Sequence, residues 1–154
     1  MNIDTEEFHI IWHVLLASVL TMLVGLEREK ANKAAGIRTN MIVGGFTCLT
    51  VLLINPMIDF LQLQNSLDVV ETDPIRVLQA IVIGISFIGA GTIIKSRGEK
   101  EVRGITTAAT LLYSVGIGIC VAIDFLATAI ALTTLIFVIN YLLNVFTKKY
   151  TSLK

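Results

Sequence analysis

The chain has 154 residues, of which 55% are hydrophobic and 16% are charged, and its mean hydropathy is +0.79. This composition leaves too little polar surface to cover a soluble globule of this size, which excludes an ordinary water-soluble domain. The 12 basic and 12 acidic residues cancel, so no excess of positive charge points to nucleic acid, and no such partner is expected.

Five stretches without Asp, Glu, Lys or Arg divide the chain. They are 17 to 23 residues long, and at about 1.5 Å of rise per residue each can cross a hydrocarbon core of roughly 30 Å as a helix. The sequence therefore predicts an all-α integral membrane protein, a single domain over residues 1–154 built as a bundle of five transmembrane helices. The expected helices cover residues 8–26, 39–55, 74–95, 105–123 and 125–147.

The charged residues separate across the predicted membrane. Eleven of the 12 Lys and Arg residues lie in the segments 28–38, 95–103 and 148–154, and acidic residues dominate the three segments on the opposite side. Basic segments of multi-pass proteins face the cytoplasm. We therefore expect the N-terminus outside and the C-terminus in the cytoplasm, and the acidic start is unlike a signal peptide.

The first two predicted helices differ in how they end. The first carries Ala17, Thr21 and Gly25 at intervals of four, a stripe of small residues that lets a neighbouring helix approach closely. The second is expected to stop or bend just before Pro56. The mixed apolar and polar residues that follow predict a short helix over residues 57–67 that lies in the outer interface of the membrane.

The third predicted helix has a clear start and a glycine-rich body. Asp73 is a favourable N-cap, and Pro74 suits the first helical position. Gly84, Gly89 and Gly91 are candidate helix-packing residues because small side chains let helices approach closely in a membrane. We expect the third and fourth helices at the centre of the bundle and the more bulky fifth helix facing lipid.

Polar residues gather at the predicted cytoplasmic ends of the helices. The second and fourth helices each begin just after an arginine, and a helix N-terminus with an arginine beside it favours an anion or a carboxylate. The alternative is that these are ordinary flanking charges and simple helix caps. The predicted inner polar cluster contains Glu27, Arg38, Asn40, Lys95, Arg103, Thr106 and Thr107.

Two further groups lie at the predicted outer side. Arg76 is the one basic residue there. Pairing with Asp73, Glu71 or Asp124, or extension of the side chain toward water, would lower the cost of placing its charge near the membrane. A functional gate and a plain interfacial anchor are equally good interpretations of Arg76. Glu6, His9 and His13 share one helix face, a spacing that can hold a transition metal. A belt of aromatic and imidazole rings at the interface explains them more simply, so no metal or other cofactor is expected.

Several consecutive motifs resemble those of the MgtC/SapB family in order and spacing. The resemblance covers residues 15–123 and departs from the family pattern at Ser86 and Tyr113, where Gly and Trp are expected. The motifs are GLERE at 25–29, GIRTNM at 36–41, Asp73-Pro74 with Arg76, GISFIGAG at 84–91 and VRGITTAATL at 102–111.

This resemblance implies a small protein of the bacterial inner membrane that is linked to growth in low magnesium and, in pathogens, to survival inside macrophages. It also implies action on partner membrane proteins, including the F-type ATP synthase. Many relatives continue into a cytoplasmic ligand-binding domain, whereas only residues 148–154 follow the last predicted helix here. We therefore expect the membrane domain alone, without functions that depend on the additional domain.

Catalysis finds no support in the motifs, because no nucleophile stands beside a base and no phosphate-binding glycine loop follows a strand. The chain is therefore expected not to be an enzyme. One candidate function is an inner-membrane regulator that forms a dimer or docks on a larger membrane protein. The alternative is a pathway for magnesium or another ion, assembled from several chains. Magnesium is usually held through carboxylates, and the spans contain none, which favours the regulator.

Overall fold

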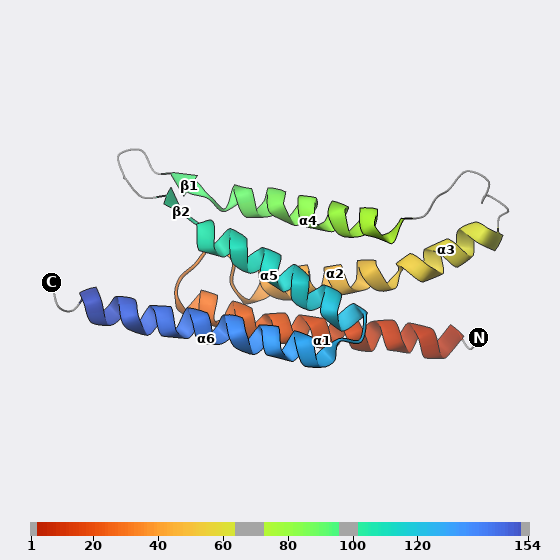
Figure 1. Ribbon diagram of the computed structural model, residues 1–154, viewed down its shortest axis with the longest axis horizontal. Coiled ribbons are helices and arrows are strands. Elements are labelled where there is room, and N and C mark those ends of the chain that lie inside the picture. Colours follow the sequence, from red (N-terminus) through yellow and green to blue (C-terminus); the bar gives the residue numbers. More distant parts are fainter. Residues whose placement is uncertain (1–2, 64–72, 96–101, 152–154) are drawn as a thin grey trace.

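The computed structural model describes the backbone of residues 3–63, 73–95 and 102–151, and the side chains of residues 5–63, 73–93 and 103–142. Within these ranges the chain forms six helices and one short hairpin, and the helices run along a common long axis (Figure 1). The elements are α1 (Ile3–Lys30), α2 (Ile37–Leu52), α3 (Ile54–Leu63), α4 (Pro74–Gly91), β1 (Ile94–Lys95), β2 (Val102–Arg103), α5 (Ile105–Ala122) and α6 (Leu126–Thr151).

Several helices are suited to crossing a membrane, as predicted. Among the described residues, four stretches are long and apolar enough to do so, and one further apolar helix is shorter. The prediction of a helical membrane bundle is confirmed at this level, and the small hairpin is an addition to it. The four stretches are Thr5–Lys30, Ile37–Leu63, Pro74–Gly91 and Ile105–Ala122, and the shorter helix is Leu126–Leu142.

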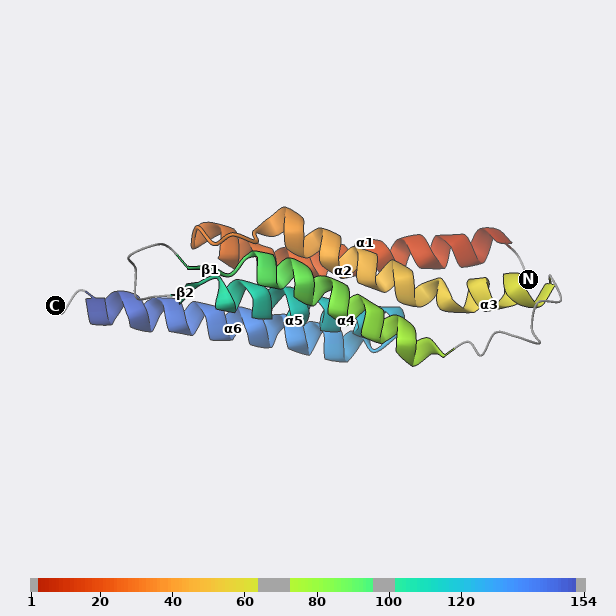
Figure 2. The same ribbon diagram turned by 90° about the horizontal axis from the view of Figure 1, so that it is seen from above.

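The helix ends fall into two groups at opposite ends of the bundle (Figures 1 and 2). One end holds the start of α1, the start of α4 and α3, whereas the other holds the end of α1, the start of α2, the hairpin and the end of α6. Arg28, Arg38 and Arg103 therefore lie at one end, and Asp73 and Arg76 lie at the other. We call the first the basic end. We call the second the acidic end, because it also holds Glu6 near the start of α1 and Asp59 in α3.

The core lies where α1, α2 and α5 meet, and small residues allow the close approach. Gly44 of α2 faces the side chain of Thr21 of α1. Gly118 of α5 packs on the α2 backbone, where a Cβ atom would stand 2.5 Å from the carbonyl oxygen of Gly44. Around this crossing, Leu111 and Ile117 are completely buried. The glycines of α2 and α5 thus bring three helices together, because small residues let membrane helices approach closely.

α4 lies at the edge of the bundle, so the prediction that it forms the packing centre is wrong. Three of its 18 residues are buried, against nine of the 18 residues of α5. Gly89 packs against α5, with its Cβ position 3.2 Å from the Cβ of Ala108, whereas the Cβ positions of Gly84 and Gly91 have no atom within 4 Å. α5 does occupy the centre as expected, and α6 exposes many large apolar side chains.

Several helix boundaries differ from those predicted. α1 extends beyond residues 8–26 at both ends. At its C-terminal end the last turn continues through charged residues, of which Glu27 and Arg28 are buried. The break after α2 lies at Leu53, because Pro56 falls in the first turn of α3, where its missing N–H group costs nothing. The predicted interfacial helix therefore begins at Ile54, and residues 64–67 lie outside the described part. α4 ends at Gly91 and not at residue 95.

A short antiparallel hairpin replaces the expected end of the third helix. Ile94 pairs with Arg103, and Lys95 pairs with Val102. Gly104 follows with φ at 95°, a left-handed conformation that side chains rarely adopt, and a Cβ atom there would collide with the carbonyl oxygen of Thr92. Glycine is thus required at this turn, which sets the direction in which α5 begins.

Candidate functional site

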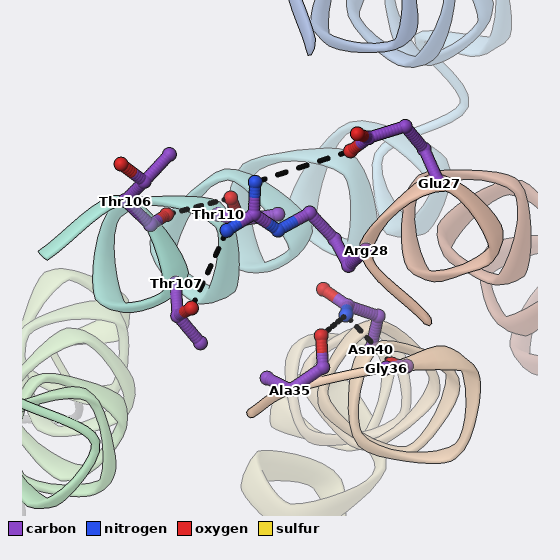
Figure 3. Close-up of polar contacts among 8 residues, drawn as sticks. All are labelled: Glu27, Arg28, Ala35, Gly36, Asn40, Thr106, Thr107 and Thr110. Carbon is purple, nitrogen blue, oxygen red and sulfur yellow. Dashed lines mark hydrogen bonds and ion pairs between the residues drawn. The ribbon is translucent and has the colours of Figure 1, made fainter. Parts of the chain in front are cut away.

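A buried arginine forms the centre of the polar residues at the basic end (Figure 3). Arg28 lies in the last turn of α1, and only 4% of its surface is exposed. Its Nη2 donates a hydrogen bond to Oγ1 of Thr107 at 3.3 Å, and its Nη1 lies 3.9 Å from Oε2 of Glu27. The guanidinium therefore joins the end of α1 to the start of α5, with a carboxylate beside it.

These side chains line a pocket between the end of α1, the start of α5 and α6. Its volume is about 200 Å³. Among its charged residues, one arginine and one lysine face one glutamate, and the N-terminus of α5 adds partial positive charge. The pocket is therefore electropositive. Its lining residues are Glu27, Arg28, Lys33, Gly104, Thr106, Thr107 and Asn140.

Two buried donors of this pocket have no hydrogen-bond partner among the described residues. They are Nε of Arg28 and Nδ2 of Asn140, whose side chain lies on α6 and is 6% exposed. An unsatisfied buried donor costs about 1–3 kcal/mol. The pocket therefore favours an occupant with acceptor oxygens, such as water, a carboxylate or a phosphate.

The loop that leads into α2 is held by side chains on both sides of it. Oε2 of Glu29 accepts a hydrogen bond from the backbone N–H of Ile37 at 2.9 Å. Asn40 donates through Nδ2 to the carbonyl oxygen of Gly36 at 2.8 Å, and its Oδ1 accepts from Oγ of Ser114 at 2.8 Å. Asn40 is completely buried. It thus fastens the start of α2 to the middle of α5.

The structure brings part of the predicted inner polar cluster together. Glu27, Thr106 and Thr107 line one pocket. The reasoning from the sequence missed Arg28, which it counted among the flanking charges. Its position along the helix did carry a signal. Thr21 and Val24 are buried on one face of α1, and Arg28, four residues after Val24, lies on the same face.

Of the other predicted members, three do not line the pocket and the fourth cannot be placed. Asn40 belongs to the core between α2 and α5. Arg38 is exposed, and within the described part of the chain its side chain makes no hydrogen bond or ion pair. Arg103 is exposed on β2, and the side chain of Lys95 lies outside the described residues. Neither Arg38 nor Arg103 is among the residues that line the pocket.

Two polar groups lie at the acidic end. Asp73 caps α4 by accepting a hydrogen bond from the N–H of Ile75 at 2.9 Å, and its Oδ2 lies 3.7 Å from Nε of Arg76. Both side chains are exposed, and exposed ion pairs contribute little to stability. His9 and His13 lie close together on α1, and Nε2 of His13 is 2.8 Å from Oδ1 of Asp124. Glu6 lies near His9 in a separate groove.

Comparison with known proteins identifies relatives of this chain. The family model described as "MgtC family" matches residues 14–149. The chain is 35% identical over 137 residues to Protein MgtC of Salmonella typhimurium, covering 89% of this chain and 53% of the relative. It is 32% identical over 117 residues to Protein SapB of Bacillus subtilis, covering 75% of this chain and 48% of the relative.

A third relative is YhiD of Escherichia coli, which carries the provisional name of a magnesium transporter. It is 34% identical over 118 residues, covering 76% of this chain and 51% of the relative. The chain spans about half the length of the curated relatives that it matches. No solved structure matches it. Since the family model covers most of the chain, this membrane protein belongs to the MgtC family.

Proposed function

We propose that this protein is a non-enzymatic regulator of the bacterial inner membrane that docks on a larger membrane protein. Membership of the MgtC family supports a role in adaptation to low magnesium or to life inside a host. In this proposal the basic end faces the cytoplasm, as the distribution of Lys and Arg favours. The resemblance makes the F-type ATP synthase the first partner to test.

The pocket at the basic end carries this proposal. Its buried donors, Nε of Arg28 and Nδ2 of Asn140, have no acceptor within the described part of the chain. A carboxylate from a partner loop would supply acceptor oxygens to both and would be favoured by the N-terminus of α5. Docking would thus supply acceptors to two donors that find none among the described residues.

α4 provides a second contact surface in this proposal. It packs mainly on α5 and leaves Gly84 and Gly91 bare, with open space at both Cβ positions. Small residues let a further helix approach closely within a membrane, where helix association depends on packing. A helix of the partner therefore has a place to lie against α4.

An ion pathway is the alternative, and the name of one relative favours it. The buried polar side chains in the middle of the described bundle are hydroxyls and an amide, including Thr21, Thr47, Asn40 and Ser114. Magnesium is held chiefly through carboxylates and keeps much of its water. Glu27 is the buried carboxylate of the described residues, and it lies at one end. This arrangement supports docking over conduction.

Co-purification from native membranes tests the proposal. Asn140→Leu removes a donor that has no hydrogen-bond partner among the described residues, so the variant is expected to fold and to lose the partner protein. Thr134→Ala is the matched control, because among the described residues this exposed side chain of α6 bonds to its own helix, at Ile130. Full retention of the partner by Asn140→Leu would contradict docking through the pocket.

A flux assay separates the two functions. The purified chain in liposomes is expected to show no more magnesium uptake than empty liposomes. Robust uptake that disappears in Glu27→Gln would instead establish the ion pathway. Cross-linking in native membranes adds a third readout. A cross-linked band at twice the mass of the chain, with no larger partner, would indicate that a second copy of the chain packs against α4.

A further inference from the structure

Both histidines of the chain meet an aspartate at the acidic end. His9 and His13 lie one turn apart on α1, and Asp124 comes from the turn between α5 and α6. One potential ligand atom from each residue lies within 4.8 Å of the others. We propose that this cluster binds a divalent transition-metal ion such as Zn²⁺ through Nε2 of His13, a carboxylate oxygen of Asp124 and a ring nitrogen of His9.

The imidazole of His13 is held as a metal ligand would be. Its Nδ1 lies 2.9 Å from the carbonyl oxygen of His9, so Nδ1 carries a proton and donates it in a hydrogen bond. Metal-binding histidines usually donate their other N–H in this way, which fixes the orientation of the ring and leaves the second nitrogen for the ion. His13 is 6% exposed. The hydrogen bond from Nδ1 and the burial of the ring thus hold Nε2 toward Asp124.

The carboxylate of Asp124 is positioned by the backbone of its turn. The residue has φ at 60°, a left-handed conformation that aspartate tolerates better than most residues. Its N–H donates to the carbonyl oxygen of Val121 at 3.1 Å, and the N–H of Phe125 donates to that of Cys120 at 2.8 Å. The side chain of Asp124 is 66% exposed. It can therefore meet an ion that arrives from water.

The ligand set selects the kind of ion. Two imidazoles and one carboxylate leave a fourth position for water, which matches the tetrahedral preference of Zn²⁺. Magnesium requires mostly oxygen ligands in an octahedral arrangement, so this set disfavours it. Binding would replace the direct contact between Nε2 of His13 and Oδ1 of Asp124, which are 2.8 Å apart.

An acidic groove beside the cluster gives cations a route to it. The groove lies between α1 and α3, has a volume of about 390 Å³, and is lined by His9 together with Glu6 and Asp59. Carboxylates at a cleft raise the local concentration of cations. A bound ion would clamp α1 to the α5–α6 turn, a property that goes beyond docking at the basic end and does not depend on it.

Calorimetry on the full chain in detergent micelles tests this site. The protein should carry an affinity tag without histidine, and Zn²⁺, Co²⁺ and Mg²⁺ should be titrated separately. We expect one Zn²⁺ per chain, a tetrahedral Co²⁺ absorption spectrum and no binding of Mg²⁺. His9→Ala and Asp124→Asn are each expected to weaken Zn²⁺ binding about tenfold or more, since even indirect ligand partners contribute about 10-fold to 100-fold.

Glu7→Gln is the matched control, because Glu7 is exposed on the same helix but is neither one of the three ligands nor part of the groove lining. It is expected to bind Zn²⁺ like the unaltered chain. His9 is also exposed, so His9→Ala keeps the test valid even where a change at His13 disturbs folding. Absence of Zn²⁺ binding, or binding that survives either His9→Ala or Asp124→Asn unchanged, would overturn the three-ligand site.

Discussion

The crossing of α2 and α5 allows a stability measurement with an internal reference. Gly118 and Gly116 lie two residues apart in α5, but their surroundings differ. A Cβ atom at Gly118 would stand 2.5 Å from the carbonyl oxygen of Gly44, 3.0 Å from Cβ of Thr47 and 3.3 Å from the N atom of Cys48, whereas one at Gly116 would have no atom within 4 Å. The same Gly→Ala change therefore collides with a helix backbone at one position and enters open space at the other.

The expected magnitude follows from two opposing effects. Replacing Gly by Ala inside a helix favours folding by about 0.8–1 kcal/mol. Overpacking a tight contact costs about 1–3 kcal/mol. Both variants share the first effect, so it cancels between them. The free energy of unfolding of Gly118→Ala is thus expected to be lower than that of Gly116→Ala by about 1–3 kcal/mol.

Unfolding by SDS in mixed micelles, followed by far-ultraviolet circular dichroism, measures this difference. Both variants should keep the helix content of the unaltered chain in mild detergent, which controls for misfolding during expression. A difference smaller than about 0.5 kcal/mol, the scatter of an ordinary surface substitution, would refute the close approach of α2 and α5 at this position.

Three further experiments have definite expected outcomes. Ser114→Ala removes the buried hydrogen bond to Asn40 and should lower the free energy of unfolding by about 1–3 kcal/mol, measured in the same SDS titration. Lys33→Cys should react with a membrane-impermeant maleimide only in lysed cells and Thr5→Cys also in intact cells, and the reverse pattern would contradict the proposed orientation. Gly104→Ala should cost at least about 1 kcal/mol because of its left-handed backbone, and an unchanged unfolding midpoint would count against the described turn.

The helices could be located from the sequence because an uncharged stretch can be recognised from consecutive residues alone. Their arrangement could not, because small residues mark every surface that allows close approach. Gly118 and Gly84 look equivalent in the sequence, yet one packs on α2 and the other faces open space. The hairpin at Ile94 was missed for a related reason, because a two-residue strand has no periodicity to detect.

The candidate site was partly predictable from helix ends. Thr106 and Thr107 follow from the start of α5, and Glu27 follows from its place near the end of α1. Arg28 was hidden by its charged neighbours, since a basic residue after a span is ordinarily a flanking charge. Asp124 could not be assigned to the histidines, because the contact joins residues 111 positions apart.

The apolar stretch that spans α2 and α3 is longer than α4, so no single bilayer thickness matches both. α2 and α3 together cover 27 residues, about 40 Å of helix, whereas α4 covers 18 residues, about 27 Å. A hydrocarbon core of about 30 Å suits α4 and falls about 10 Å short of the longer pair. Lipids would be stretched beside α2 and α3 and relaxed beside α4. The tilt of the protein in the bilayer would therefore depend on the length of the acyl chains.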